Sequence, residues 1–343
     1  MTFSTVFQYS FPTTIRFGAG SSKELGAYLL KNNLLKPLIV TDPTVAQLDF
    51  FREILTDLQN KKISVEVFHD IHKNPVRPDV YNGGDVYDAT NRDAIIGIGG
   101  GAALDVARAI ALRIHHRGDL FTYDDLVGGD IYVTNEIPHF VTIPTTAGTG
   151  SEVGRSAIIS DEITHQKKIL FSPKLLAKIV FADPLLTMEL PPFITAATGM
   201  DALTHNMEAF LAKMVHPMCD GIALEGISLI HQSLERAVNR PDLESRSKML
   251  IASLMGAVAF QKGLGVVIPW PIRCHLCWIR ITVWPMLSTF LTGLSLISKG
   301  LNINLKESPG RWNSKTKAVQ ASWHTCMRST TKLISRTNLR TSA

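Results

Sequence analysis

The sequence predicts a two-domain protein, with an α/β domain built on a parallel, doubly wound (Rossmann-like) sheet followed by an all-helical domain. Up to about residue 187, apolar runs of strand length alternate with segments of helical spacing, which is typical of parallel sheets covered by helices. After Pro191-Pro192 the apolar spacing stays helical to about residue 262. With 343 residues, of which 45% are hydrophobic, the chain can fill two cores.

The α/β domain is expected to hold five strands, which lie at 38–40, 63–68, 94–98, 139–143 and 179–181. Polar or small residues follow these strands, among them Asp42, Asn74 and Gly99. The carboxyl ends of parallel strands meet at one edge of the sheet, where open α/β sheets bind their ligands. The sequence therefore predicts a ligand site at that edge.

The glycine run 99–101 is well placed to cradle a phosphate, because it joins a strand to helical spacing at 102–112. Glycines let the backbone approach a pyrophosphate, and the helix directs its free N–H groups and positive dipole end at it. A strand-to-helix turn often needs glycine for its own conformation. The run 145–151 adds hydroxyls and small residues after a neighbouring strand, and the pair favours a nucleotide site.

Asp42, which ends the first clear strand, bears on the choice of nucleotide. A carboxylate there can accept hydrogen bonds from ribose hydroxyls and would repel a 2′-phosphate, which favours NAD over NADP. The alternative is an aspartate that only forms a turn before Pro43.

The helical domain contains a candidate metal pair in Asp201 and His205. Residues four apart project from one face of a helix, a spacing that suits two ligands of one divalent ion. The alternative is an ordinary surface hydrogen bond between the two. Glu208, one turn further on, either supports the metal ligands from outside the coordination sphere or is a solvated carboxylate.

Four stretches resemble the iron-containing (group III) alcohol dehydrogenase family in order and spacing. They are GGGAALDVARA (99–109), IPTTAGTGSEV (143–153), ADPLLTMELPP (182–192) and TGMDALTHNMEAF (198–210). The likeness runs from about residue 10 to Val267. It implies the two-domain, dehydroquinate synthase-like architecture of that family, incomplete at the C-terminus.

The resemblance also implies an enzyme that interconverts a primary alcohol and an aldehyde by hydride transfer to NAD. The implied NAD contacts are Asp42, Asn74, Gly99, Gly100, Gly101, Ala102, Thr142, Thr145, Thr146, Ser151 and Lys167. Asp201 and His205 are implied as catalytic metal ligands, half of a four-ligand site for Fe²⁺ (alternatively Zn²⁺) that polarises the substrate oxygen. A related polyol (glycerol-type) dehydrogenase and an inactive nucleotide-binding remnant are the alternatives.

Two residues depart from the family pattern in the glycine motif: Ala102 replaces the usual serine and Arg108 the usual lysine. Ala102 removes a hydroxyl near the phosphates, so weaker NAD binding is expected. A larger departure concerns the remaining two metal ligands, which the family spacing places as histidines near positions 268 and 282. The chain has Ile268 and Thr282 there.

The composition also changes at Ile268. Residues 268–343 hold 11 Lys/Arg, one acidic residue and all five tryptophans, which leaves 1–267 with a net charge of −5 although the whole chain has +5. Codons that spell residues 268–284 can be chosen so that reading one base earlier gives HSMAHPLSSLLDTHHGL, with histidines at both expected positions. A frameshift after Val267 is therefore our hypothesis, and impaired activity is its consequence.

Other interpretations of residues 268–343 are possible. Cys274, His275 and Cys277 could bind a metal, the uncharged stretch 281–298 could mimic a membrane span, and the basic residues could bind phosphates nonspecifically. The frameshift hypothesis weakens all three.

Three segments are expected: an NAD-binding domain at 1–187, a partial helical metal-binding domain at 188–267, and a poorly ordered segment at 268–343. Four cysteines without a regular pattern and the lack of a secretory signal favour the cytoplasm. The expected partner is a small alcohol or aldehyde, and a homodimer is the candidate assembly. Neither a membrane nor a specific nucleic acid is expected as a partner.

Overall fold

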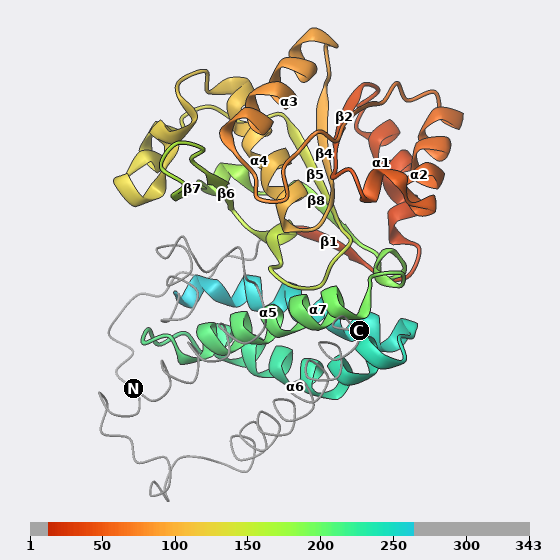
Figure 1. Ribbon diagram of the computed structural model, residues 1–343, viewed down its shortest axis with the longest axis vertical. Helices are drawn as coiled ribbons and strands as arrows, with labels where there is room; N and C mark the ends of the chain where they lie inside the picture. The colour runs from red at the N-terminus through yellow and green to blue at the C-terminus, as the bar shows by residue number, and fades with distance from the viewer. Residues whose placement is uncertain (1–12, 264–343) are drawn as a thin grey trace, which may run out of the picture. The chain divides into compact units, whose positions relative to one another are not determined.

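The computed structural model describes residues 13–263 (Figure 1). The chain forms two compact units, Met1–Glu189 and Leu190–Ala343. The predicted segment 268–343, including the cysteine motif and the stretch 281–298, lies outside the described residues.

Unit 1 contains the predicted parallel sheet. Its six strands lie in the order β1-β8-β5-β4-β2-β3, and every neighbouring pair is parallel. The strands are β1 (Thr14–Phe17), β2 (Pro37–Val40), β3 (Glu66–Phe68), β4 (Ala94–Gly99), β5 (His139–Pro144) and β8 (Ile179–Ala182). The parallel sheet is confirmed. The sequence reading missed β1, whose short run TIRF lacks a buried apolar face, and made β3 too long.

Helices cover both faces of this sheet (Figure 1). They are α1 (Leu25–Lys31), α2 (Asp49–Asn60), α3 (Arg77–Ala89) and α4 (Gly101–His115). Successive residues of β4 enter different cores: Ile95 packs with α3 and α4, whereas Ile96 joins the cluster of α1 and α2. This double coverage explains why β4 reads as a continuous apolar run.

Shorter elements complete unit 1. A two-stranded antiparallel sheet joins β6 (Ser156–Ser160) to β7 (Lys167–Phe171), a hairpin that the sequence reading also missed. The 3-10 helices are η1 (Ser21–Glu24), η2 (Val45–Gln47), η3 (Leu120–Tyr123), η4 (Asp125–Val127), η5 (Gly129–Tyr132), η6 (Ser151–Val153), η7 (Pro173–Leu175) and η8 (Pro184–Thr187). The hairpin and η6 matter most here, because predicted cofactor residues lie on them.

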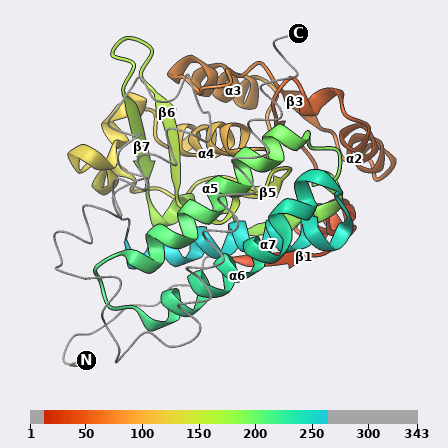
Figure 2. The ribbon, with the colours of Figure 1, turned by 60° about the horizontal axis from the view of Figure 1, so that its bottom comes forward.

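Unit 2, as far as it is described, is helical as predicted. Its helices α5 (Pro192–Leu211), α6 (Pro217–Asn239) and α7 (Leu243–Ala259), with the short η9 (Phe260–Lys262), pack against one another (Figure 2). A Cβ at Gly199 would lie 2.3 Å from Leu234 Cδ1, so this glycine permits close helix approach. The Asn206 amide on α5 donates to Ala202 O at 2.8 Å and to Ala252 O on α7 at 2.9 Å.

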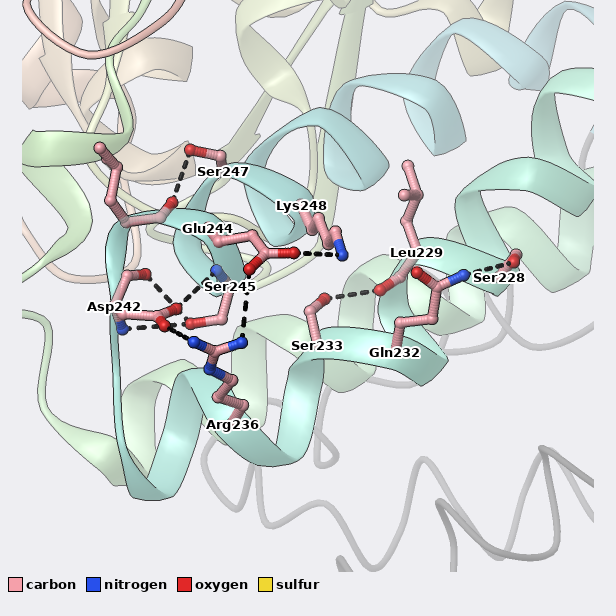
Figure 3. Close-up of polar contacts among 11 residues, drawn as sticks. Ser228, Leu229, Gln232, Ser233, Arg236, Asp242, Glu244, Ser245, Ser247 and Lys248 are labelled. Atoms are coloured by element: carbon pink, nitrogen blue, oxygen red, sulfur yellow. Dashed lines mark hydrogen bonds and ion pairs between the residues drawn. The ribbon is translucent and has the colours of Figure 1, made fainter.

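The turn between α6 and α7 is held by a polar network (Figure 3). Asp242 caps α7 by accepting from Ser245 N at 2.9 Å, and Ser245 Oγ accepts from Asp242 N at 3.2 Å. Arg236 of α6 pairs with Asp242 and, at 3.4 Å, with Glu244. This reciprocal cap starts α7 at a defined residue. Within residues 13–263, no helix has the length and apolar character needed to cross a membrane.

Candidate functional site

The glycine turn lies at the carboxyl end of β4, as predicted. Gly99 has φ +150°, and a Cβ there would lie 2.8 Å from Ala103 Cβ, so both conformation and space require glycine. A Cβ at Gly101 would lie 3.2 Å from Thr149 Oγ1. Ala102 follows in the first turn of α4, where the backbone N–H groups of a helix have no partner within it. The turn thus offers an open backbone cradle for an anionic group.

Asp42 forms the predicted turn and also lies beside the glycine run. Its Oδ1 accepts from Thr44 N at 2.9 Å and from Val45 N at 3.0 Å, which makes the turn after β2. Its Oδ2 lies 3.4 Å from the position that a Gly99 Cβ would take. The carboxylate therefore forms the turn with one oxygen and presents the other beside the glycine run.

Thr41 is a polar residue at this edge that the sequence reading missed. Its Oγ1 is buried, has no hydrogen-bond partner among residues 13–263, and lies 4.0 Å from the Gly99 Cβ position. A buried hydroxyl without a partner costs free energy, so it often marks a ligand position. The available signal was its place at the end of β2, directly before Asp42.

Asn74 and Lys167, which are 93 positions apart in the sequence, are brought to one place by Ser160. The Ser160 hydroxyl donates to Asn74 Oδ1 at 3.2 Å, and Ser160 pairs directly with Lys167 across the β6–β7 ladder. Lys167 is buried, whereas Asn74 is exposed. The hairpin thus places Lys167 opposite Ser160, whose hydroxyl contacts the amide of Asn74.

The loop after β5 lies against the glycine turn. Thr145 N donates to Gly99 O at 3.0 Å, and a Gly100 Cβ would lie 3.4 Å from Thr146 Oγ1. The other two predicted hydroxyls are engaged within the protein. Thr142 Oγ1 donates to Glu152 O at 3.1 Å, and Ser151 Oγ donates to Asp105 Oδ1 at 2.7 Å.

Buried charges lie beneath this loop. Arg108 of α4 is fully buried and lies 3.3 Å from Asp105 Oδ1. Burial raises the pKa of Glu152 to about 7, although the nearby Arg108 charge opposes that shift. Glu152 Oε1 has no hydrogen-bond partner among residues 13–263. The carboxyl is therefore largely protonated at mildly acidic pH, unlike a solvated glutamate.

In unit 2, α5 places Asp201 and His205 on one face as predicted. His205 Nε2 lies 3.4 Å from Asp201 Oδ1, and both side chains are mostly buried. Two ligands of a tetrahedral ion, at bond lengths of about 2.1 Å, stand roughly 3.4 Å apart. The pair thus fits two positions around one divalent ion. Glu208 is buried, so the solvated-carboxylate alternative is wrong.

The rest of a metal site is not present among residues 13–263. This part of the chain contains no group of three or more His, Cys, Asp or Glu residues that could hold an ion. His205 Nδ1 is buried without a hydrogen-bond acceptor, whereas a ligating histidine usually donates its second N–H to one. The Phe260 ring covers His205 at 4.7 Å between centroids. Positions 268 and 282 lie outside the described residues.

Two family models match the chain. Residues 12–184 match the model for iron-containing alcohol dehydrogenase, and residues 195–267 match the C-terminal model of the Fe-containing alcohol dehydrogenase family. The two matches together span both predicted sites, and the second ends at Val267.

Curated relatives agree with these matches. The chain is 38% identical over 257 residues to 4-hydroxybutyrate dehydrogenase of Cupriavidus necator, covering 74% of this chain and 66% of the relative. It is 35% identical to 1,3-propanediol dehydrogenase of Citrobacter freundii (76% and 68% covered) and 35% identical to NAD-dependent methanol dehydrogenase of Bacillus methanolicus (75% and 67%). The chain spans about two thirds of the length of the curated relatives it matches, and less than two thirds of several.

Solved structures show the same fold. A 1,3-propanediol oxidoreductase superposes with a TM-score of 0.83 at 29% identity, covering 95% of this chain and 87% of that one. A sulfoacetaldehyde reductase from Bifidobacterium kashiwanohense, solved in complex with NAD⁺, gives a TM-score of 0.79 at 24% identity, covering 95% and 86%.

Proposed function

This chain belongs to the iron-containing alcohol dehydrogenase family, and from that premise we propose that its fold serves the NAD-dependent interconversion of a primary alcohol and an aldehyde. The observation that carries the proposal is the edge of the unit 1 sheet. There the Gly99–Gly101 turn, Asp42 and Thr146 surround one backbone cradle. Such an edge suits the pyrophosphate and ribose of a dinucleotide.

We assign NAD rather than NADP because of Asp42. Its Oδ2, beside the glycine run, accepts no hydrogen bond from residues 13–263 and is available to ribose hydroxyls. A 2′-phosphate at the same place would meet a like charge. Lys167 and Asn74, held together by Ser160, form a second polar group for the cofactor.

Asp201 and His205 are the residues that would hold a ferrous ion, with Zn²⁺ as the alternative. When bound, such an ion supplies Lewis-acid polarisation of the substrate oxygen. Two protein ligands alone hold an ion weakly and leave the substrate without a fixed pose. We therefore propose that this chain has little or no dehydrogenase activity.

The cause that we propose is the frameshift after Val267. It is supported by the end of the C-terminal family match at residue 267 and by the change in composition at Ile268. Resequencing the DNA around codons 265–270 tests it. If resequencing finds one base more than the present sequence implies, the natural protein has a complete metal site. If it confirms the sequence, the chain is a damaged copy.

The substrate class that we propose is a short primary alcohol with a second polar group. Relatives named for 1,3-propanediol and 4-hydroxybutyrate support this class, and the relative named for methanol supports a simple alkanol as the alternative. A cytoplasmic location, which the unpatterned cysteines support, is part of the same proposal, and a homodimer is the proposed assembly.

Two measurements on the full chain test the proposal. Calorimetric titration should show binding of NAD and weaker binding of NADP. Elemental analysis after incubation with Fe²⁺ should show far less than one ion per chain. Absence of NAD binding would contradict the cofactor assignment, and turnover at the rate of an intact relative would contradict the impairment.

A further inference from the structure

Arg108 is a charged side chain in the interior of unit 1. Its exposed fraction is 0%, and its guanidinium lies over the Phe140 ring at 5.6 Å from the centroid. A buried charge is costly unless it is fully hydrogen-bonded and paired. The partners of Arg108 therefore indicate what this side chain does.

Those partners come from separate elements. Arg108 Nη1 donates to Ser151 Oγ at 2.9 Å and to Ser156 O at 2.8 Å, while Nη2 donates to Ser151 O. Arg108 Nε donates to Leu175 O at 3.1 Å. One side chain of α4 is thus bonded to the end of the loop after β5, the start of β6, and η7.

Asp105, one turn earlier on α4, completes the network. Its Oδ1 accepts from Ser151 Oγ at 2.7 Å, and its Oδ2 accepts from Ile158 N at 3.2 Å. Ser151 is therefore held by both charged residues through its hydroxyl and by Arg108 through its carbonyl. At the other end of the same loop, Thr145 N donates to Gly99 O.

We propose that Arg108 is a positioning residue that fixes the 144–151 loop against the glycine turn, and that Ser151 is its anchor point in the loop rather than a ligand of the cofactor. That the loop borders a cofactor rests on the proposed function, whereas the anchoring of the loop by Arg108 does not. The planar fork of arginine reaches separated acceptors at once, which the single ammonium of lysine cannot do.

Amide hydrogen exchange of the full chain without NAD tests the anchoring. The substitution R108K keeps the charge but loses the fork, and R117K is the matched control, because Arg117 is an exposed arginine just beyond α4 that pairs with Asp88. Exchange in segment 144–153 should rise about tenfold in R108K, which loses charged hydrogen bonds, and stay unchanged in R117K. Segment 94–99 of β4 should stay protected in both.

Unchanged exchange in R108K would overturn the proposal, and so would an equal rise in segment 94–99, which would mean general destabilisation. The variant S151A separates the two roles of Ser151. As an anchor, its loss should speed exchange in 144–153 and weaken NAD binding together. If S151A weakens NAD binding but leaves amide exchange as in the unaltered chain, Ser151 is a ligand of the cofactor. That result would overturn its assignment as an anchor. If no variant and no unaltered chain binds NAD, the proposed function fails, while the exchange result still decides the anchoring.

Discussion

The cofactor edge of unit 1 and the Asp201–His205 pair of unit 2 differ in how much of each site residues 13–263 supply. At the cofactor edge, the glycine turn, Asp42 and the loop after β5 come together within one unit. In the described part of unit 2, residues 190–263, two candidate ligands stand 3.4 Å apart with no third. A nucleotide cradle made largely of backbone needs only a few strand ends, whereas a metal site needs side chains from several helices.

The largest effect that would sharpen this comparison is on turnover. Under the frameshift hypothesis, a version of the chain read one base earlier from codon 268 gains histidines at positions 268 and 282. We then expect at least about 10³-fold more alcohol oxidation, since a bound ion contributes several kcal/mol. The check is NADH formation with 1,3-propanediol and Fe²⁺. The control is NAD affinity, which should change little, and equal turnover by both chains would break the comparison.

A second prediction concerns the glycine turn. Gly99→Ala adds a Cβ that lies 2.8 Å from Ala103 Cβ at φ +150°, so we expect about 3 kcal/mol lower unfolding free energy from strain and overpacking. Urea denaturation measures it. Gly128→Ala is the control, because Gly128 has φ +76° with open space around it and should cost only the strain. Equal costs would show that close packing at Gly99 is unimportant.

A third prediction concerns pH. Burial raises the Glu152 pKa from 4.5 to about 7, so between these values the unfolded chain ionises while the folded chain retains the proton. The contribution of this proton to the free energy of unfolding is thus complete below pH 4.5 and is lost as the pH rises to about 7. Relative to the unaltered chain, Glu152→Gln should gain about 3 kcal/mol in unfolding free energy between pH 4.5 and pH 8. Urea denaturation at both pH values checks this, and a constant difference would contradict it.

The smallest expected effect is on nucleotide choice. Asp42→Asn keeps an oxygen that can accept from Thr44 N but removes the charge beside Gly99. We expect the preference for NAD over NADP to fall about tenfold, which is the size of one charge–charge interaction near a surface. The ratio of the two dissociation constants measures it. A preference that survives the change would assign Asp42 to the turn alone.

Sequence patterns predicted most of the central architecture because burial on both faces leaves a direct signal. The run at 94–98 and the glycines after it correspond to β4 and the start of α4. The edge strand β1 and the β6–β7 hairpin were missed, because partly exposed strands of four or five residues carry little apolar pattern. The candidate site residues were predicted from motifs, and those predictions included neither Thr41 nor the buried contacts of Arg108.

The sequence by itself determined the parallel sheet, the glycine turn, the Asp201–His205 spacing and the break at Ile268, because each is a local pattern of residue types along the chain. Only the tertiary structure decided which of these residues are partners. It joined Asn74 to Ser160, turned the Ser151 hydroxyl toward Asp105, and buried Arg108 among acceptors from three segments. Such pairings arise because a buried polar group must be satisfied by whatever the fold brings near it, and sequence spacing does not record that proximity.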